Sequence, residues 1–503
     1  MFDASRMRLL FVVADPGRLR YFESPLEVLA RRRARVHVII ERPRERIAGQ
    51  MRFIEDLVAR SPTITWGAGP RPDAAEWTAF RRELGAAYDA VHYQQSGFDG
   101  APEFRARAKE ASPRYARAAS ALLPSRGARA QTTLARAVLG AANAAPVAPN
   151  LRAAVREHRP DVVLVSPLFW FGSPQSEWIR AAKAEGVRTM GCLFSWDNLT
   201  SKGALRATPD ALTVWNQAQA EEAATLHGVP RGRIVVTGAQ NWDHWVDWKP
   251  SRTREQFAEE VGFPLDRPYI LFLESSSYMG GEGAFGREWL TFIRNAQNPA
   301  VRDAHVVIRP HPQAIRDEWA PVAGLGGVTV WPREGKVPLD RPAREDFFDS
   351  MHHATAVVGV NTSSFLEAAM FERPALTVTP PELARAQSHT VHFRHLLSEN
   401  GGPVISAPTL EAHVEQLGRV LAGDWSVEPS RAFVRRFLRP HGLQSRAAEH
   451  WVAAVEELCR RPAPRPVAPS RVDRIGERVL SPYAGRLSRH QRERTAAKRG
   501  EPR

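Results

Sequence analysis

Short apolar runs rich in Val, Ile and Leu recur along the chain, and stretches of helical propensity separate them. Continuous apolar runs are typical of strands buried on both faces, and their alternation with helices is typical of βαβ units and parallel sheets. The runs fall into two halves, so the pattern predicts an α/β protein in which each half forms its own open sheet. The predicted strands are residues 8–14, 35–40, 161–166, 187–194, 211–215 and 233–238 in the first half, and 269–274, 305–309, 328–331, 356–360, 375–378 and 403–406 in the second.

Changes in composition predict the domain boundaries. Residues 241–268 hold several prolines around one short helical stretch, which is typical of an interdomain linker. Residues 101–150 are rich in Ala and Arg and favour helices, and Pro and Arg dominate from Pro462 onward. We therefore predict a first domain at 1–249 with a helical insertion at about 101–150, a second domain at 250–461, and a basic flexible tail at 462–503.

The overall composition is that of a globular protein. The chain has 503 residues, of which 43% are hydrophobic and 25% are charged. It contains no apolar stretch long enough to cross a bilayer, its first residues lack the pattern of a signal peptide, and its two cysteines cannot form a disulfide framework. We expect a cytoplasmic protein with reduced thiols.

Half of the formal net charge of +14 lies in residues 462–503. Val472, Ile475 and Val479 would share one face of a helix there, with Arg471, Arg474 and Arg478 nearby. This short amphipathic unit predicts contact with an anionic membrane at the inner face of the plasma membrane; a solvated disordered terminus is the alternative.

Candidate site residues follow the predicted strands, because ligands of open α/β sheets bind beyond the carboxyl ends of the strands. Arg309 and His311 come at the end of residues 305–309, in a loop stiffened by two prolines. A guanidinium can clamp a diphosphate, and an imidazole can donate a hydrogen bond or move a proton. A rigid turn with a solvated Arg and His is the alternative.

A turn rich in hydroxyl groups, Asn361-Thr362-Ser363-Ser364, follows residues 356–360 and precedes a predicted helix. Backbone N–H groups at such a helix start can bind a phosphate. Ser364 and Glu367 also have the spacing of a capping box, which needs no ligand.

A glycine-rich loop at 280–286 follows Ser275 and includes Gly281 and Gly283. The loop starts several residues after the strand, so a dinucleotide fingerprint is not expected. We predict a loop that faces phosphate or acceptor, with an ordinary surface loop as the alternative.

In the first half, Trp196, Asp197 and Lys202 follow residues 187–194. A carboxylate at a strand end can deprotonate an acceptor hydroxyl, although Asp197 could instead bond its own turn. Gly17, after the first strand, would let an acceptor approach the backbone. If Asp197 is not the base, Asp15 and His92 are the next candidates.

Several motifs are absent from the sequence. It has no Walker P-loop, G-x-S-x-G, H-E-x-x-H or D-x-D motif, and no aromatic-basic module that would bind nucleic acid. We therefore expect no ATPase, α/β-hydrolase or zinc-protease activity, no metal site, no cofactor and no nucleic-acid partner.

The motifs that are present, taken in their order along the chain, resemble those of GT-B-type glycosyltransferases. Residues 161–457 are similar to CDP-glycerol glycerophosphotransferases. Trp196 and Lys202 match that family, while Asp197 stands where the family has a catalytic histidine. The family's Thr-Gly-x-x-x-x-Asp before the linker is matched by Thr237, Gly238 and Asp243.

The resemblance continues in the second half. His311 matches a second family histidine, and Ser363 and Ser364 match a serine pair on the donor phosphate. Glu367 falls where the related UDP-GlcNAc 2-epimerases place a glutamate on the ribose or sugar hydroxyls of the donor.

The resemblance implies two Rossmann-like domains facing across a cleft. The protein would then be a metal-independent glycosyltransferase. Its second domain would bind a UDP-, CMP- or CDP-linked sugar, and its first domain would bind a polysaccharide or lipid-linked acceptor of the bacterial cell envelope. A CDP-glycerol-type polyol-phosphate transferase, a UDP-sugar 2-epimerase and a non-catalytic membrane-associated scaffold are the alternatives. The expected residues are Asp197 and His311 for catalysis, Ser275, Gly281, Gly283, Arg309, Asn361, Thr362, Ser363, Ser364 and Glu367 for the donor, and Gly17, Trp196 and Lys202 for the acceptor.

Overall fold

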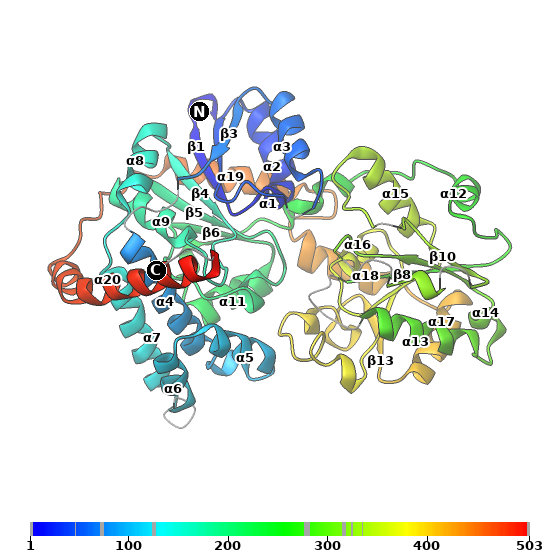
Figure 1. Ribbon diagram of the computed structural model, residues 1–503. Helices are drawn as coiled ribbons and strands as arrows, with labels where there is room; N and C mark the ends of the chain where they lie inside the picture. Colours follow the sequence, from blue (N-terminus) through cyan, green and yellow to red (C-terminus); the bar gives the residue numbers. More distant parts are fainter. Residues whose placement is uncertain are drawn as a thin grey trace. The chain divides into compact units, whose positions relative to one another are not determined.

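The computed structural model describes residues 4–45, 47–70, 75–122, 127–275, 282–313, 318–322, 325–333 and 335–499. The chain divides into two compact units with one parallel sheet each (Figure 1). Unit 1 comprises residues 1–46, 54–243 and 446–503, and unit 2 comprises residues 47–53 and 244–445. The predicted two-domain α/β fold is confirmed, and the cleft between the domains stays a prediction.

The sheet of unit 1 has seven strands in the order β3-β2-β1-β4-β5-β6-β7. All pairs are parallel, and β4 is buried along its whole length, as expected for a sheet covered on both faces. Its strands are β1 (Arg8–Val13), β2 (Arg35–Ile40), β3 (Ile64–Ala68), β4 (Val162–Ser166), β5 (Arg188–Cys192), β6 (Ala211–Val214) and β7 (Ile234–Val236).

The helices of unit 1 cover this sheet and form a separate helical layer. They are α1 (Pro16–Leu19), α2 (Glu23–Arg31), α3 (Gln50–Ala59, of which residues 50–53 are assigned to unit 2), α4 (Ala75–His92), α5 (Pro102–Ala111), α6 (Arg114–Leu122), α7 (Gly127–Asn143), α8 (Pro149–His158), α9 (Gln175–Ala184), α10 (Asn198–Ser201), α11 (Gln217–His227), α19 (Ala447–Arg460) and α20 (Arg471–Arg499). Helices α4 to α7 are the predicted helical insertion, which begins at Ala75 rather than near residue 101.

The sheet of unit 2 has six parallel strands in the order β10-β9-β8-β11-β12-β13. The strands are β8 (Tyr269–Leu273), β9 (His305–Arg309), β10 (Val328–Val330), β11 (Ala356–Gly359), β12 (Ala375–Val378) and β13 (Val404–Ala407). The helices are α12 (Arg254–Val261), α13 (Glu282–Arg294), α14 (Pro299–Arg302), α15 (Arg341–His352), α16 (Ser364–Met370), α17 (Leu410–Leu421) and α18 (Glu428–Phe433).

Each of the twelve predicted strands is present within a few residues of its expected bounds, and one further strand, β3, escaped prediction. Its sequence Ile-Thr-Trp-Gly-Ala has only one fully buried residue, Ile64, because β3 is the edge strand of the sheet. A short edge strand lacks the continuous apolar run that marks the central strands.

The predicted boundary at residue 461 is corrected by α19, which belongs to unit 1. The carboxylate of Asp243 is fully buried and accepts hydrogen bonds from the backbone N–H groups of Ala447 (3.0 Å) and Ala448 (2.6 Å). These are first-turn donors of α19 that have no partner within the helix. The aspartate of the Thr-Gly-x-x-x-x-Asp pattern therefore ties the returning chain to unit 1.

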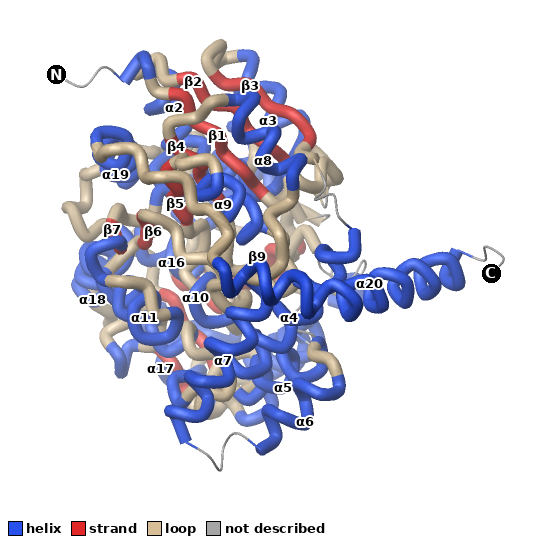
Figure 2. The backbone as a smooth tube through the Cα atoms, turned by 90° about the vertical axis from the view of Figure 1, so that its left-hand side faces the viewer, coloured by secondary structure: helices blue, strands red, loops and turns tan. Residues whose placement is uncertain are grey.

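The flexible tail is also corrected, since residues 471–499 form the helix α20, which lies along α4 (Figure 2). Ala484 is fully buried and, with Leu480 and Leu487, packs on the cluster that includes Trp77 and Phe80 of α4. The apolar residues at helical spacing outweigh the single Pro482 in the helix. Along the described residues, no helix has the length and apolar character needed to cross a bilayer.

Candidate functional site

The carboxyl ends of β2, β1, β4 and β5 are neighbours in unit 1, so the segments that follow these strands meet at one edge of the sheet. Asp15 and Gly17 follow β1, Glu41 follows β2, and Trp170 and Asp197 follow β4 and β5. Gly17 lies in the short helix α1, and Trp196 is buried beside Asp197. The acceptor-side candidates therefore lie at one edge of the sheet, and their role stays a prediction.

The carboxylate of Asp197 is held by its own turn. It accepts hydrogen bonds from the Ser195 hydroxyl (2.6 Å) and the Ser201 hydroxyl (2.8 Å), and forms an ion pair with Lys202 Nζ at 2.8 Å. These three contacts engage both oxygens of the Asp197 carboxylate. This arrangement suits an orienting residue better than the predicted general base.

Cations and aromatic rings surround this turn. The Arg18 guanidinium lies 4.8 Å from the ring centre of Trp170 and 4.5 Å from that of Phe194, and Lys202 Nζ lies 5.6 Å from that of Trp170. Tyr21 stacks on Phe194 with 4.9 Å between ring centres. We call Arg18, Arg20, Tyr21, Trp170, Phe194 and Lys202 the cation-aromatic cluster.

Positive charges surround Tyr21 in the cation-aromatic cluster. Arg20 Nη2 donates to the Tyr21 hydroxyl at 2.6 Å. Burial raises the pKa of Tyr21, but the charges of Arg20, Arg18 and Lys202 outweigh burial and bring that pKa below its ordinary value. Sequence reasoning missed Arg18, Tyr21 and Trp170, although Arg18 directly follows the noted Gly17.

The helical insertion fixes the turn from behind. The Tyr93 hydroxyl accepts from Gly203 N (3.1 Å), and Asp89 accepts from Ala204 N (2.9 Å) and from Arg206 (2.5 Å). His92 stacks on His227 in the same layer and is 2% exposed. Burial also drives the pKa of His92 well below its ordinary value. Because the ring is almost fully enclosed, we do not propose His92 as the base.

Glu41 is a carboxylate that the sequence reasoning passed over. Its Oε1 accepts from Trp178 Nε1 at 3.2 Å, and burial raises the pKa of Glu41 to about 7. Neighbouring Asp15 is 4% exposed and lies between Arg18 (3.7 Å) and Arg42 (3.8 Å). Inspecting the residue after every predicted strand would have found Glu41, because it directly follows β2.

Arg309 lies at the end of β9 as predicted, but its side chain is only 4% exposed. Its Nη1 donates to Asp346 Oδ2 at 2.8 Å, and the guanidinium lies 5.2 Å from the ring centre of Phe347. Trp331 Nε1 donates to the other oxygen of Asp346 at 2.8 Å. This buried ion pair corrects the predicted diphosphate clamp, because the charge of Arg309 is compensated inside the unit.

His311 is half-buried beyond β9, where its backbone N–H donates to Glu274 Oε2 at 3.1 Å and its Nδ1 accepts from Gln313 N at 3.1 Å. Burial, together with neighbouring Glu318, raises the pKa of Glu274 above its ordinary value, although hydrogen bonds from Trp319 and His311 oppose that rise. The rigid position predicted for His311 is present, and its catalytic role stays a prediction.

The predicted glycine-rich loop at 280–286 is helical from Glu282 onward, where α13 begins. Gly281 lies outside the described residues, whereas Gly283 lies in the first turn of α13, where an added Cβ would come within 2.0 Å of the Glu318 side chain. Close packing therefore explains Gly283. Ser275 donates through its backbone N–H (3.0 Å) and hydroxyl (3.2 Å) to Glu282, whose pKa burial raises to about 8.

The hydroxyl turn after β11 presents the side chains of Ser363 and Ser364 to solvent, whereas Thr362 is buried. Ser363 is exposed and Ser364 half-buried, and the N-cap Ser363 makes no capping hydrogen bond through its side chain. Thr362 Oγ1 accepts from Ser364 N at 3.3 Å. Glu367 instead accepts from Trp245 Nε1 at 3.1 Å, so the capping-box alternative is wrong.

The other residues near this turn have structural partners. The Asn361 amide donates to the carbonyl of Ala386. Trp245 packs on Phe347, Phe348 and Phe371. The hydroxyl turn and His311 are thus the parts of the predicted donor site that reach the surface of unit 2.

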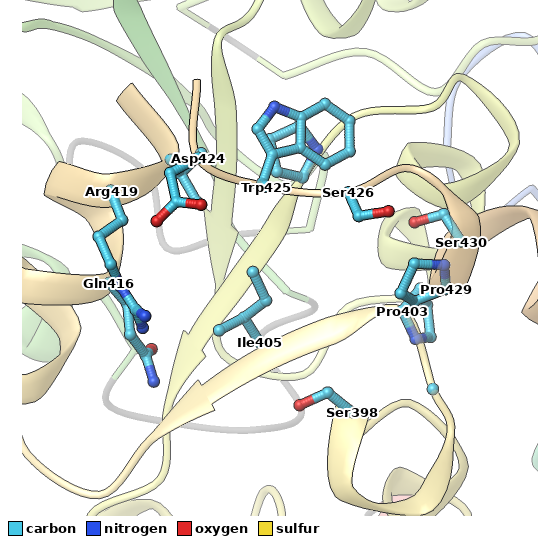
Figure 3. Close-up of a pocket in the computed structure, with 13 residues that line it drawn as sticks. Ser398, Pro403, Ile405, Gln416, Arg419, Asp424, Trp425, Ser426, Pro429 and Ser430 are labelled. Atoms are coloured by element: carbon cyan, nitrogen blue, oxygen red, sulfur yellow. The ribbon is translucent and has the colours of Figure 1, made fainter. Parts of the chain in front are cut away.

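A cavity of about 210 Å³ opens at the opposite end of the same sheet (Figure 3). Pro374 and Pro403, which directly precede β12 and β13, line it together with Gln416 and Trp425. Because it lies at the amino ends of the strands, none of the predicted site residues contributes to it.

No protein-family model and no curated protein sequence matches the chain. Three solved structures are similar in fold along nearly the whole chain. A glycosyltransferase from Rickettsia africae has a TM-score of 0.52 with 8% identity, covering 91% of this chain and 100% of its own. A Listeria monocytogenes protein assigned as a UDP-N-acetylglucosamine 2-epimerase has a TM-score of 0.51 with 12% identity, covering 92% and 100%.

The third similar structure is S. aureus MnaA in complex with UDP, with a TM-score of 0.50 and 11% identity over 90% of this chain and 96% of its own. Identities this low establish the arrangement of the backbone and leave the chemistry to the residues. The similarity to a glycosyltransferase and to an assigned epimerase shows that the two parallel-sheet units of this chain have a GT-B-like fold.

Proposed function

We propose that the protein is a glycosyltransferase that uses a nucleotide-activated sugar. The observation that carries the proposal is the hydroxyl turn Thr362–Ser364 after the buried strand β11. Ser363 is exposed there, and its side chain makes no capping hydrogen bond to the helix that follows. The similar structures named above include a glycosyltransferase and a complex with UDP, which supports a nucleotide donor. Unit 2 would bind the donor and unit 1 the acceptor.

The hydroxyl turn has the chemistry that a donor phosphate needs. Ser363 and Ser364 offer hydroxyl donors at the carboxyl end of the sheet, while the backbone N–H of Ser364 donates to Thr362 Oγ1. His311, held by Glu274 after β9, would donate to the leaving phosphate as negative charge develops there. Arg309 would support this edge through its pair with Asp346 rather than bind the donor.

Glu41 is the base that we propose for the acceptor hydroxyl. Three observations support this role for Glu41: it directly follows β2, its carboxylate is half-buried, and burial raises its pKa to about 7, near the working pH of most enzymes. Asp197 would instead keep Lys202 and its turn in place.

Calorimetric titration of UDP, CDP and CMP into the full chain tests the donor site. Ser363→Asp places a carboxylate beside the proposed phosphate position, so affinity for the best nucleotide should fall at least about tenfold. Because Ser363 is exposed, the variant should fold normally.

Ser398→Asp is the matched control, since Ser398 is exposed and lines the cavity at the amino end of β13. Its nucleotide affinity should equal that of the unchanged protein. Weaker binding in Ser398→Asp but not in Ser363→Asp would move the donor site to that cavity. Conversion of a UDP-sugar to its 2-epimer without any acceptor would contradict the transferase.

We further propose that α20 holds the enzyme on an anionic membrane, where a lipid-linked acceptor would lie. Val472, Ile475 and Val479 are 77%, 63% and 70% exposed on this helix, while Leu480 and Ala484 pack inward. Arg471, Arg474 and Arg478 flank the exposed residues. Exposed apolar residues beside cations are typical of helices that lie in a membrane interface.

Liposome co-sedimentation tests α20 without removing it, since deletion would uncover Trp77 and Phe80. The triple variant Val472→Ser, Ile475→Ser, Val479→Ser should lose most binding to vesicles that contain phosphatidylglycerol. Val467→Ser is the control, because Val467 is 60% exposed but precedes the helix. Equal binding of all three proteins, or binding that ignores salt and lipid charge, would contradict the proposal.

A further inference from the structure

We propose that the cation-aromatic cluster of unit 1 binds an oxyanion, a phosphate or carboxylate, carried by the acceptor. The inference rests on the proposed function, because it names the chemical class of the acceptor for that same reaction. The observation that carries it is a set of cations at the carboxyl ends of β1 and β5 that aromatic rings hold in place.

The aromatic rings position these cations without neutralising them. Arg18 lies over Trp170 and Phe194, and Arg20 lies 4.6 Å from the ring centre of Tyr21. A guanidinium on a ring face keeps its full charge, and the N–H groups at its edge can bind a planar anion. Arg18 also lies 3.7 Å from the Asp15 carboxylate, which compensates part of its charge. Arg20 has Tyr21 as its partner instead.

Charge at this edge is unequal. Four cations, Arg18, Arg20, Arg42 and Lys202, face the two carboxylates Asp15 and Asp197. The third carboxylate at this edge is Glu41, whose pKa burial raises to about 7. No carboxylate of the described residues lies within ion-pair distance of Arg20, and its guanidinium donates to Tyr21 instead. The low pKa of Tyr21 is the response of a neighbouring group to this excess of positive charge.

The cluster also has donors to offer. An ammonium has three N–H donors, and the ion pair with Asp197 uses one of those on Lys202. Lys202 is 29% exposed and Trp170 and Tyr21 are half-buried, so the cluster reaches solvent. The turn is rigid because Tyr93 and Asp89 bind the backbone of Gly203 and Ala204.

The geometry of Gly203 supports this fixed position. Its φ is +128°, and an added Cβ would come within 2.9 Å of Phe171 N. A rigid site loses little entropy when a ligand binds, so a few charge-assisted hydrogen bonds suffice for recognition.

Calorimetry of the full chain in phosphate-free, low-salt buffer tests the inference with three sugars: D-glucose 6-phosphate, D-glucuronate and D-glucose. We expect one or both anionic sugars to bind and neutral glucose to show no heat at the same concentrations. The phosphate and carboxylate arms identify which oxyanion the cluster prefers.

Lys202→Gln should weaken binding of the preferred anionic sugar about tenfold, the usual result of losing one charge-assisted hydrogen bond. Arg20→Gln should act in the same direction, which guards against a folding defect in either variant. Arg231→Gln is the matched control, because Arg231 precedes β7 at the amino end of the same sheet and is 63% exposed. It should leave affinity unchanged.

Three results would overturn the inference: equal binding of glucose and the anionic sugars, equal weakening in Arg231→Gln, or loss of anion binding when UDP is present at saturation. The last would make the cluster a donor-phosphate site. If no nucleotide binds while glucose 6-phosphate does, the donor proposal fails and the oxyanion site stands.

Discussion

The arginines at the carboxyl edges of the two sheets have different partners. In unit 1, rings hold Arg18 and Arg20, whereas in unit 2 the strand-end cation Arg309 is buried against Asp346. Unit 2 presents the hydroxyls of Ser363 and Ser364 in place of a cation. A strand-end arginine that is buried against a carboxylate has its charge compensated inside the unit, whereas Arg20 lies against Tyr21 and keeps its charge for a ligand to use.

The largest expected effect concerns the strand-end carboxylates. Glu41→Gln should lower kcat by about 10² to 10⁴-fold, whereas Asp197→Asn should cost much less. The ionised form of a base is the active one, so kcat/KM of the unchanged enzyme should rise as pH increases through about 7. That rise should vanish in Glu41→Gln.

The measurement is initial rate against pH for both variants and the unchanged enzyme. A larger loss in Asp197→Asn than in Glu41→Gln would return the role of base to Asp197. Stability gives an independent check: because folding raises the pKa of Glu41, the free energy of unfolding should fall as pH rises from about 4.5 to 7. Glu41→Gln should flatten that fall.

The buried pair of unit 2 provides the next test. Asp346→Ala leaves Arg309 without its main partner and should lower the free energy of unfolding by about 3 to 5 kcal/mol. Urea denaturation measures the change. In Arg231→Gln, whose ion pair is exposed, the same experiment should show a change below about 1 kcal/mol. Similar values for the two variants would contradict the contrast between buried and exposed arginines.

The layer behind the cation-aromatic cluster gives a smaller effect. Tyr93→Phe removes the acceptor of Gly203 N and leaves that buried N–H unsatisfied, at a cost of about 1 to 3 kcal/mol in stability. Affinity for the anionic sugar should fall a few-fold, while nucleotide affinity stays unchanged. Calorimetry with both ligands separates this positioning role from a general loss of folding, which would reduce both affinities alike.

Asp243→Ala should affect stability and neither ligand site. Two first-turn N–H groups of α19 would lose their acceptor, which should cost about 1 to 3 kcal/mol. Thermal unfolding should show the shift, with nucleotide and anionic-sugar affinities unchanged below the transition. A change in either affinity would show that α19 also positions a site.

The sequence alone determined the elements and the edge at which ligands are expected. Buried parallel strands need continuous apolar runs, so twelve of the thirteen strands among the described residues were predictable. The order of elements also placed Asp197, Lys202 and Ser363 after strands. The Asp197 contacts were also readable, because Ser195, Ser201 and Lys202 lie within five residues of it.

The tertiary structure decided which charges are compensated. Arg309 meets Asp346, and Arg18 meets Trp170 and Phe194, through contacts between segments far apart in sequence. Likewise Leu480 and Ala484 of α20 have a packed environment because the fold brings them against Trp77 and Phe80 of α4. Hydrophobic spacing specifies local structure, but the burial and partners of a charged side chain depend on which distant segments the fold brings beside it.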